Sequence, residues 1–327
     1  MIIVTGGAGF IGSALIAGLN AGGVSDILVV DRLGTDEKWK NLRALSFADY
    51  VEKDDFLEMA LEGKLDAPIE AVLHMGACSD TTEANASYLI RNNYEYTKLL
   101  AQWAHEAGIR FIYASSAATY GDGSAGFCDD EEKIDRLRPL NMYGYSKHLF
   151  DLWARRTGLL KKIVGLKYFN VFGPNEYHKA HMRSFVIKAY EQIAEKGAVA
   201  LFKSHKPEYK DGEQLRDFLY VKDAVRMTLF FLDHPHLAGL YNIGSGRART
   251  WNDLAKAVFA AMKKPEKIEY IPMPPQIRNQ YQYHTQADTK KIKKGGYTTE
   301  PAPLENAIKD YVHNYLQIGR HLDPAKL

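Results

Sequence analysis

The sequence predicts an α/β fold with a doubly wound parallel sheet and a second, smaller α/β lobe for substrate. Short apolar segments alternate with helix-length segments through the first half of the chain, which is the βαβ rhythm of such a sheet. The first expected strand runs straight into a glycine-rich turn, and the second ends in an acidic residue. Both features are typical of a nucleotide-binding sheet. The expected strands lie at residues 2–4, 27–30, around 51, 71–73, 111–113 and 163–166.

The glycine-rich turn is the first candidate binding site. Gly6 allows a tight turn, Gly9 lets backbone amides approach a pyrophosphate, and Gly12 lets the following helix lie against the sheet. The positive end of that helix would face the phosphates. Asp31 lies nineteen residues beyond Gly12, where the fold places a carboxylate for the adenosine ribose. The pattern predicts a bound dinucleotide, and a tight turn without a ligand is the alternative.

Ligands of a doubly wound sheet bind at the rim where the carboxyl ends of the strands meet. Residues 216–223 and 239–246, late in the chain, again resemble rim segments, so the chain is expected to return to the first domain. Between and beyond them the sequence is irregular and rich in proline and polar residues. We therefore expect a dinucleotide-binding domain of residues 1–170 plus about 215–250 and a substrate lobe of about 171–214 plus 251–327. The expected rim residues are Thr5, Asp31, Lys53, 74–79, Ser115, Ser116 and 168–170.

Composition excludes several classes of protein. The chain has 327 residues, 46% of them hydrophobic and 25% charged, which is enough to bury a substantial core. Its formal net charge of +2 indicates no polyanion-binding surface, so no nucleic-acid partner is expected. Two cysteines, Cys78 and Cys128, cannot form a disulfide framework, and no apolar run is long enough to span a membrane. The glycine strand begins at residue 2 and leaves no room for a signal peptide, so we expect a cytoplasmic protein with no membrane partner.

A tyrosine and a lysine four residues apart supply the candidate chemistry. Tyr143 and Lys147 would share one face of a helix, where the ammonium stabilises the phenolate and lowers the pKa of the phenol from about 10. Such a pair can take the proton of an alcohol while hydride leaves for a nicotinamide. Ser116 on the rim would polarise the substrate oxygen, and Lys147 would also hold the ribose. A second pair, Tyr94 and Lys98, is interpreted as surface or packing residues because of its position before the rim serine.

With the glycine turn, the rim serine and the tyrosine–lysine pair in this order, nearly the whole chain resembles the extended short-chain dehydrogenase/reductase family of nucleotide-sugar enzymes, which is built on a Rossmann sheet. Several segments are similar to members of that family that epimerise ADP-linked heptoses. These segments are residues 26–31, 76–79, 113–121, 143–147, 168–171 and 285–288.

The resemblance implies a redox-neutral isomerase. Tightly held NADP, or alternatively NAD, would take hydride from C6'' of an ADP-heptose and return it to the other face of the resulting ketone, in the synthesis of lipopolysaccharide precursors. The resemblance also implies association into a homo-oligomer. Inversion needs proton transfer from two sides, so a second acid/base besides Tyr143 is implied, and the matching residue is Lys179.

The neighbourhood of Lys179 leaves other interpretations open. Judged by the residues alone, Lys179 is a loop lysine near the rim, for which a solvated position is the default. His178 and His181 raise the alternative of a metal site, but two histidines without a further cysteine or carboxylate cluster favour no metal. His181 is interpreted as a substrate contact or a loop residue.

The resemblance implies the remaining contacts. For the cofactor they are Gly6, Gly9, Phe10, Ile11, Gly12, Asp31, Arg32, Lys38, Lys53, Met75, Gly76, Ala77, Cys78, Ser79, Asn92, Lys147, Val171 and Lys179. For the substrate they are Ser116, Asn170, His181, Lys188, Phe202, Lys203, Ser204, His205, Arg216 and Tyr281. A guanidinium at Arg216 suits a diphosphate, and Phe202 or Tyr281 could pack on adenine, with core packing as the alternative for both aromatic residues.

The resemblance implies NADP rather than NAD, because the family pattern carries lysines at the positions that match Lys38 and Lys53, and the charge of Arg32 acts in the same direction. Asp31 alone would favour the free 2'-hydroxyl of NAD, whereas Arg32, Lys38 and Lys53 could surround a 2'-phosphate. An exposed position on a solvated edge is the alternative for Lys38.

The chain departs from the family pattern in three places. Lys167 stands where an arginine is usual, Met75 replaces an acidic residue at the rim, and the loop of residues 203–216 is long. We expect these changes to affect contacts to the diphosphate and to leave the redox centre intact.

Three other functions fit parts of the pattern. A UDP-sugar 4-epimerase uses the same serine, tyrosine and lysine, and turnover of a UDP-hexose would distinguish it. A 4,6-dehydratase is disfavoured because residues 116–119 lack the acid pair that eliminates water. A catalytically inactive, NADP-sensing binding protein would normally have lost Tyr143 or Lys147, and both are present.

Overall fold

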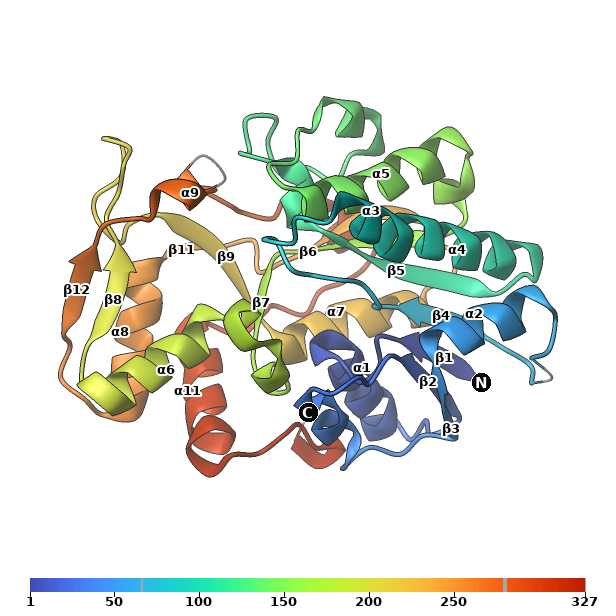
Figure 1. The fold of residues 1–327 in the computed structure, drawn as a ribbon, viewed down its shortest axis with the longest axis horizontal. Coiled ribbons are helices and arrows are strands. Elements are labelled where there is room, and N and C mark those ends of the chain that lie inside the picture. The colour runs from blue at the N-terminus through green and yellow to red at the C-terminus, as the bar shows by residue number, and fades with distance from the viewer. Residues whose placement is uncertain (66, 279–280, 327) are drawn as a thin grey trace.

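Seven parallel strands form the central sheet of the computed structural model, which describes residues 1–65, 67–278 and 281–326 (Figure 1). Their order across the sheet is β10-β6-β5-β4-β1-β2-β3, and every neighbouring pair is parallel. Six of these strands coincide with the six segments expected from the sequence, so the doubly wound α/β fold is confirmed. The strands are β1 (Ile2–Thr5), β2 (Ile27–Asp31), β3 (Asp49–Glu52), β4 (Ala71–His74), β5 (Arg110–Ser116), β6 (Val164–Tyr168) and β10 (Gly239–Ile243).

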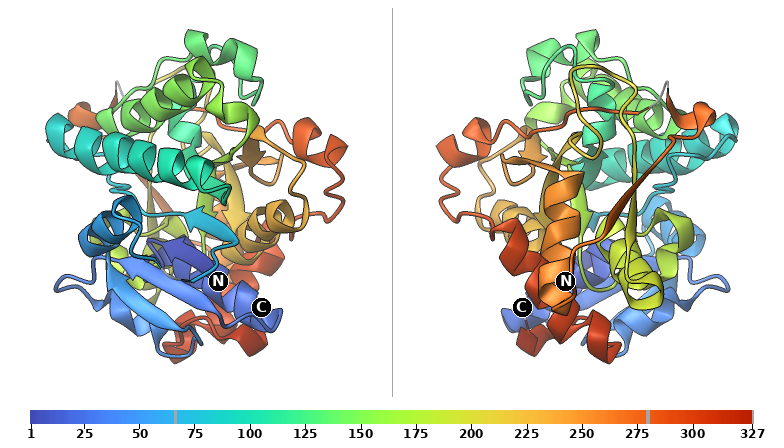
Figure 2. Two further views of the ribbon diagram at one scale, coloured as in Figure 1. Left: turned by 90° about the vertical axis from the view of Figure 1, so that its right-hand side faces the viewer. Right: turned by 90° about the vertical axis from the view of Figure 1, so that its left-hand side faces the viewer.

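Helices cover both faces of this sheet (Figures 1 and 2). One face carries α1 (Phe10–Ala21) and α7 (Val221–Asp233), and the other carries α2 (Lys53–Leu61), the short α3 (Ala86–Leu89), α4 (Tyr96–Glu106) and α5 (Met142–Arg156). Successive side chains of a strand point to opposite faces. Ile2 and Val4 of β1 therefore enter the core beneath α1 and α7, and Ile3 enters the core beneath α2, α4 and α5.

The rest of the chain builds a smaller region with two further sheets. The first contains β11 (Ala248–Thr250), β9 (Leu215–Tyr220) and β7 (Asn170–Phe172), and the second contains β12 (Ile268–Ile271) and β8 (Val199–Phe202). The helices of this region are α6 (Phe185–Lys196), α8 (Trp251–Met262), α9 (Pro275–Arg278), α10 (Lys290–Lys294) and α11 (Leu304–Asn314).

One expected strand belongs to a different sheet. Residues 216–223 were expected at the rim of the large sheet, but β9 pairs with β7 and β11 in the small one. The chain then passes through α7 and returns to the large sheet at β10, which pairs with β6. Two segments that were expected at one rim thus lie in different sheets, β9 in the small sheet and β10 in the large one. The domain boundaries themselves stay a prediction.

The outer edge of β10 is covered by side chains from other segments. The amide of Leu240 donates to Glu131 at 2.8 Å, and the amide of Asn242 donates to Asp129 at 2.9 Å. Lys291 donates from Nζ to the Leu240 carbonyl at 2.8 Å. These contacts satisfy backbone groups that an edge strand would otherwise leave open.

A fully buried ion pair joins β6 to α5. Lys167 Nζ lies 2.6 Å from Asp151 Oδ2, and both side chains have no exposed area. The same carboxylate accepts hydrogen bonds from the hydroxyls of Tyr113 and Ser115, each at 2.8 Å. Lys167 also donates to the Thr119 hydroxyl at 2.7 Å. The lysine that departs from the family pattern is therefore held in a complete network behind the rim serines.

We expect Lys167→Met to lower the free energy of unfolding by about 3–5 kcal/mol, because it leaves Asp151 buried without a cation. Lys167→Arg keeps the charge and is expected to cost less. Urea denaturation followed by circular dichroism measures both. Lys133→Met, which removes an exposed pair with Asp130, is the matched control and should unfold with wild-type protein. A wild-type midpoint for Lys167→Met would show that the hydroxyl donors alone stabilise Asp151.

Candidate active site

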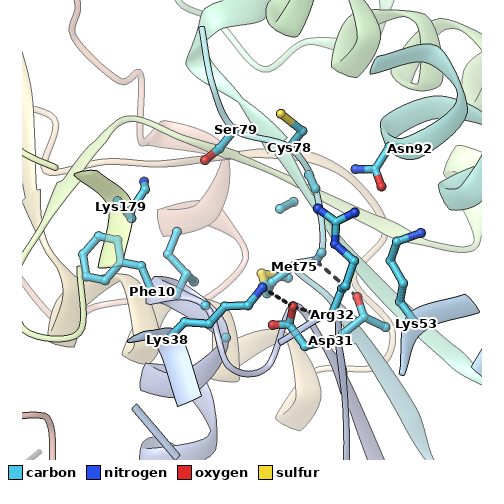
Figure 3. Close-up of a pocket in the computed structure, with 18 of the residues that line it drawn as sticks. Phe10, Asp31, Arg32, Lys38, Lys53, Met75, Cys78, Ser79, Asn92 and Lys179 are labelled. Atoms are coloured by element: carbon cyan, nitrogen blue, oxygen red, sulfur yellow. Dashed lines mark hydrogen bonds and ion pairs between the residues drawn. The ribbon is translucent and has the colours of Figure 1, made fainter. Parts of the chain in front are cut away.

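A pocket of about 360 Å³ lies at the carboxyl edge of the large sheet (Figure 3). Its lining comes from the glycine turn, the ends of β2 and β4, helix α5 and the segment that carries Lys179. Every predicted cofactor contact except Val171 lines this pocket. Val171 lines a second pocket instead, because β7 joins the small sheet.

The glycine turn fits a dinucleotide by its backbone geometry. Gly6 has φ +65°, which a side chain would strain. A methyl group on Gly12 would stand 2.1 Å from the Gly6 carbonyl oxygen, so only glycine lets α1 start here. No acidic side chain occupies the first turn of α1. The positive end of this twelve-residue helix is thereby open toward the pocket, as pyrophosphate binding requires.

The adenosine end of the pocket combines one carboxylate with several cations. Asp31 is buried, and its Oδ1 accepts hydrogen bonds from the Arg32 amide at 2.7 Å and from Lys38 Nζ at 2.8 Å. Its Oδ2 accepts from the Ala8 amide at 2.9 Å. Figure 3 shows the Arg32 and Lys53 side chains rising from the same edge of the pocket. Lys53 pairs with the neighbouring carboxylate of Asp54 at 2.5 Å, whereas the exposed Arg32 guanidinium has no acidic partner among the described residues.

A chain of buried hydrogen bonds fixes the loop after β4. Burial lowers the pKa of His74 to about 3, and Lys147 adds to the shift, so the imidazole is neutral. His74 Nδ1 lies 2.6 Å from the Thr5 hydroxyl, which also accepts the Gly76 amide at 3.2 Å. On its other side, His74 Nε2 lies 2.9 Å from the hydroxyl of Thr97, a residue of α4. The rim backbone at residues 75 and 76 is therefore tied to β1 and α4 together.

Asn93 joins that loop to α5. Its side chain exchanges two 2.9 Å hydrogen bonds with the Cys78 backbone and donates to the Ser146 hydroxyl at 3.1 Å. Ser146 in turn donates to the Tyr143 carbonyl at 2.7 Å. Asn93 lies in a π-helical segment, Ile90–Glu95, a type of turn often found at functional sites.

Tyr143 and Lys147 lie on α5 and line the same pocket. Asn141 caps this helix by accepting the Gly144 amide at 2.8 Å. Lys147 is buried and donates from Nζ to the Ala114 carbonyl at 2.8 Å. Burial lowers the pKa of Lys147 to about 8, against the opposing charge of Asp151.

The pKa of Tyr143 differs from the sequence expectation. Burial raises it, and a side-chain hydrogen bond with Ser116 only partly opposes that rise. Lys147 was expected to lower this pKa, but burial of the phenol outweighs any such effect. Burial costs the charged form of each group, so the phenol stays protonated.

Lys179 lies where the first pocket meets a second one. It belongs to a 3₁₀ segment, Tyr177–Met182, and lines both the first pocket and a second one of about 510 Å³. Its Nζ stands 5.6 Å from the centre of the Phe10 ring, beside the glycine turn (Figure 3). Burial lowers the pKa of Lys179, and Glu176 opposes the shift. The residues alone predict a solvated side chain for Lys179. The structure instead places this side chain in the pocket wall.

The second pocket gathers part of the predicted substrate site. Asn170, His181, Lys188, Arg216 and Tyr281 line it. The Arg216 guanidinium is buried, and its carbon lies 4.9 Å from the centre of the Tyr281 ring. The Arg216 side chain donates to the Leu215 carbonyl at 2.8 Å. The aromatic ring and the cation thus form one wall of the pocket.

Some predicted residues lie elsewhere. Of the residues that the structure describes, Phe202, Lys203, Ser204 and His205 line neither pocket. They end β8 and enter a loop that folds on itself, where the Ser204 amide donates to Asp211 at 2.8 Å. Ser116 also lines neither pocket. Its hydroxyl accepts the Ala118 amide at 3.1 Å and lies near enough to Tyr143 to oppose the rise in the pKa of that phenol.

The second tyrosine–lysine pair stays away from both pockets. Lys98 Nζ stands 6.0 Å from the centre of the Tyr94 ring and 5.3 Å from that of Trp153. These contacts agree with the interpretation of Tyr94 and Lys98 as packing residues.

The two histidines beside Lys179 contact different segments. His178 Nδ1 lies 3.4 Å from Asn41, and His181 Nε2 lies 3.2 Å from Asp80. Across residues 1–65, 67–278 and 281–326, no cluster of three or more His, Cys, Asp or Glu side chains is arranged for a metal ion. No helix in those ranges has both the length and the apolar character needed to cross a bilayer.

Sequence reasoning missed several pocket residues. His178, Tyr88 and Tyr96 line the first pocket, and Trp251 lines the second. The position of His178 next to Lys179 was a usable signal. Trp251 gave none, because it starts a helix far along the chain and reaches the pocket only through tertiary packing. Its indole N–H donates to the Tyr281 hydroxyl at 2.8 Å.

Comparisons with known proteins agree with this geometry. A protein from Nitratidesulfovibrio vulgaris (strain DP4) named ADP-L-glycero-D-manno-heptose-6-epimerase is 54% identical over 97% of this chain and 98% of its own length. The crystal structure of the Helicobacter pylori protein of that name superposes with a TM-score of 0.81 at 29% identity, covering 96% of this chain and 95% of that one. A Thermus thermophilus UDP-glucose 4-epimerase in complex with NAD gives a TM-score of 0.76 at 25% identity, covering 95% and 98%.

The family model described as the NAD dependent epimerase/dehydratase family matches residues 2–244, which include the glycine turn, Tyr143, Lys147 and Lys179. This match covers well over half of the chain. The chain is therefore an epimerase-type isomerase with a nicotinamide-binding Rossmann sheet, and it belongs to the NAD dependent epimerase/dehydratase family.

Proposed function

We propose that the chain converts ADP-D-glycero-D-manno-heptose into ADP-L-glycero-D-manno-heptose by inverting C6'', in the synthesis of lipopolysaccharide precursors. The 54% identity to a relative named for this activity supports the substrate. The observation that carries the mechanism is that Tyr143 and Lys179 come from different elements and line one pocket, which Lys179 shares with the second pocket. An inversion needs two such groups, one for each face of the reacting carbon.

The glycine turn and Lys147 would hold a nicotinamide cofactor in the first pocket, where it would supply reversible hydride transfer at C6'' with no net oxidation. Tyr143 exchanges the hydroxyl proton on one face, and Ser116 orients its phenol. Lys179 exchanges the proton on the other face. Burial raises the pKa of Tyr143 and lowers that of Lys179, which makes the phenol a better proton donor and brings the amine closer to accepting a proton. The pocket thus supports opposite proton-transfer roles at the same pH.

The second pocket supports recognition of the nucleotide sugar. Arg216 would bind the diphosphate with guanidinium donors, and Tyr281 would pack on the adenine ring. Asn170, His181 and Lys188 would contact the sugar and phosphates from the same pocket wall. Residues 202–205 are left out of this proposal because they line neither pocket.

NADP is the cofactor that we propose. Lys38 already occupies Asp31 Oδ1, which would otherwise accept the 2'-hydroxyl of NAD. Lys38 and the exposed Arg32 would then bind a 2'-phosphate, with Lys53 at the same edge of the pocket. NAD stays the alternative.

We expect a homo-oligomer that acts in the cytoplasm, without a nucleic-acid or membrane partner. We also keep the division into a cofactor domain of residues 1–170 plus about 215–250 and a substrate lobe formed by the rest.

We expect Tyr143→Phe and Lys179→Met each to lower kcat by about 100- to 10,000-fold, because each removes one proton-transfer group. Incubation with ADP-D-glycero-heptose followed by NMR at C6'' measures the turnover. Bound cofactor should be retained in both variants, and Lys98→Met, outside both pockets, is the matched lysine control. Full activity in Lys179→Met would exclude the two-base mechanism.

Substrate deuterated at C6'' should keep its label, because the hydride that leaves this carbon returns to it. Mass spectrometry of the product after many turnovers in ordinary water measures the retention. Exchange of the label with water would indicate removal of a proton from carbon instead. Turnover of UDP-glucose with no turnover of ADP-heptose would replace the proposal with a UDP-sugar 4-epimerase.

We expect Lys38→Met to weaken NADP binding by about tenfold, the effect of losing one charge-assisted hydrogen bond. NAD binding should stay unchanged or tighten, because the variant frees Asp31. Isothermal titration of cofactor-free protein measures both affinities. Lys40→Met, which removes a pair with Glu37 on the same 3₁₀ segment, is the matched control. Equal losses for the two cofactors would contradict the assignment of NADP.

A further inference from the structure

Two buried asparagines connect the C-terminal tail to the active site. Asn41 donates from Nδ2 to the Ala8 carbonyl of the glycine turn at 2.9 Å and to the Asn175 carbonyl at 3.1 Å. Its Oδ1 lies 2.7 Å from Nδ1 of His321, near the end of the chain. Asn41 is 1% exposed, so these bonds are shielded from water. One side chain thus contacts the cofactor turn, the segment before Lys179 and the tail.

Asn175, in the segment before Lys179, contacts both helix α1 and the tail. Its Nδ2 donates to the Ser13 hydroxyl in the first turns of α1 at 2.9 Å, and its Oδ1 accepts the Leu322 amide at 2.7 Å. Leu322 is fully buried. Figure 1 shows the C-terminus beside α1. The tail therefore closes a ring of contacts around the start of the cofactor-binding helix.

The segment that carries Lys179 needs such support. Asn175 has φ +79° and Ala180 has φ +46°, both in the left-handed region that disfavours residues with a side chain. Conformations of this kind persist only where surrounding contacts impose them. Between the two lies Tyr177, whose hydroxyl donates to the Arg320 carbonyl at 2.7 Å and whose ring packs edge-on against His321, with 5.0 Å between ring centres. The tail contacts are thus concentrated where the backbone of the Lys179 segment is least favourable.

We propose that residues 320–322 are a positioning element of the active site, which holds the Lys179 segment against the glycine turn through Asn41 and Asn175. The inference rests on the proposed role of Lys179. It deepens that role by naming the groups that set the position of its amine. Loss of the tail contacts lets the segment and the turn move apart, so both proton transfer and cofactor retention weaken. Arg216 and Tyr281, the proposed diphosphate and adenine contacts in the second pocket, make none of these tail contacts, so we expect KM to change less than kcat.

The test compares His321→Ala with His321→Asn, whose Nδ2 takes the place of the imidazole Nδ1 and restores a donor toward Asn41, in the full-length protein. We expect His321→Ala to lower kcat about 5- to 10-fold, as for the loss of one hydrogen bond, with KM within about twofold of wild type. Release of bound cofactor into a dilute buffer should accelerate by a similar factor. His321→Asn should recover most of both losses. Tyr177→Phe, which removes only the hydroxyl that contacts Arg320, should show a weaker version of the same pattern and serves if His321→Ala does not fold.

His313→Ala is the matched control, because its imidazole lies 2.7 Å from the Ala261 carbonyl, away from both pockets. It should lower stability without changing kcat or cofactor release. Wild-type kcat and wild-type cofactor release in His321→Ala, alongside a lower melting temperature, would reduce the tail to a purely structural role and overturn the proposal. Failure of wild-type protein to turn over ADP-heptose would instead overturn the proposed function, while the cofactor-release measurement would still decide the role of the tail.

Discussion

The close approach of α1 to the glycine turn is the constraint on which the rest of the site depends. A single methyl group at Gly12 would collide with the Gly6 carbonyl, so the helix can start here only on glycine. The same turn supplies the Ala8 amide to Asp31 and the Ala8 carbonyl to Asn41. Ser13 of the helix then receives Asn175. The positions of the adenosine end, the Lys179 segment and the tail therefore all depend on the close contact between Gly12 and the Gly6 carbonyl.

The elements that could be predicted from sequence are those whose signals are local. Six strands of the large sheet and the glycine turn follow from short apolar runs and glycine spacing, and the structure has them where expected. The assignment of β9 to the large sheet was wrong, because pairing partners depend on connections that no local pattern encodes. Tyr143 and Lys147 were found from helical spacing. Lys179 came from the resemblance alone, since its place in the pocket depends on a segment with two unfavourable backbone angles.

Burial sets the electrostatics of the site more than pairing does. It raises the pKa of Tyr143 and lowers those of Lys147 and Lys179, although the sequence suggested that the lysine would dominate the phenol. A site of this kind favours uncharged acids and bases until a charged ligand enters it. The Asp151–Lys167 pair, in contrast, lies within one closed hydrogen-bond network behind the rim.

The covered edge of β10 limits how copies of this protein can associate. Glu131 and Asp129 occupy the amides that a neighbouring strand would need, and Lys291 occupies a carbonyl. An added strand would have to displace charged side chains from their partners before it gained a single backbone bond. Growth of the large sheet from one molecule into the next is therefore blocked at this border, which protects a protein with seven parallel strands from edge-to-edge aggregation. Any assembly across this side of the molecule has to use side-chain contacts between folded surfaces.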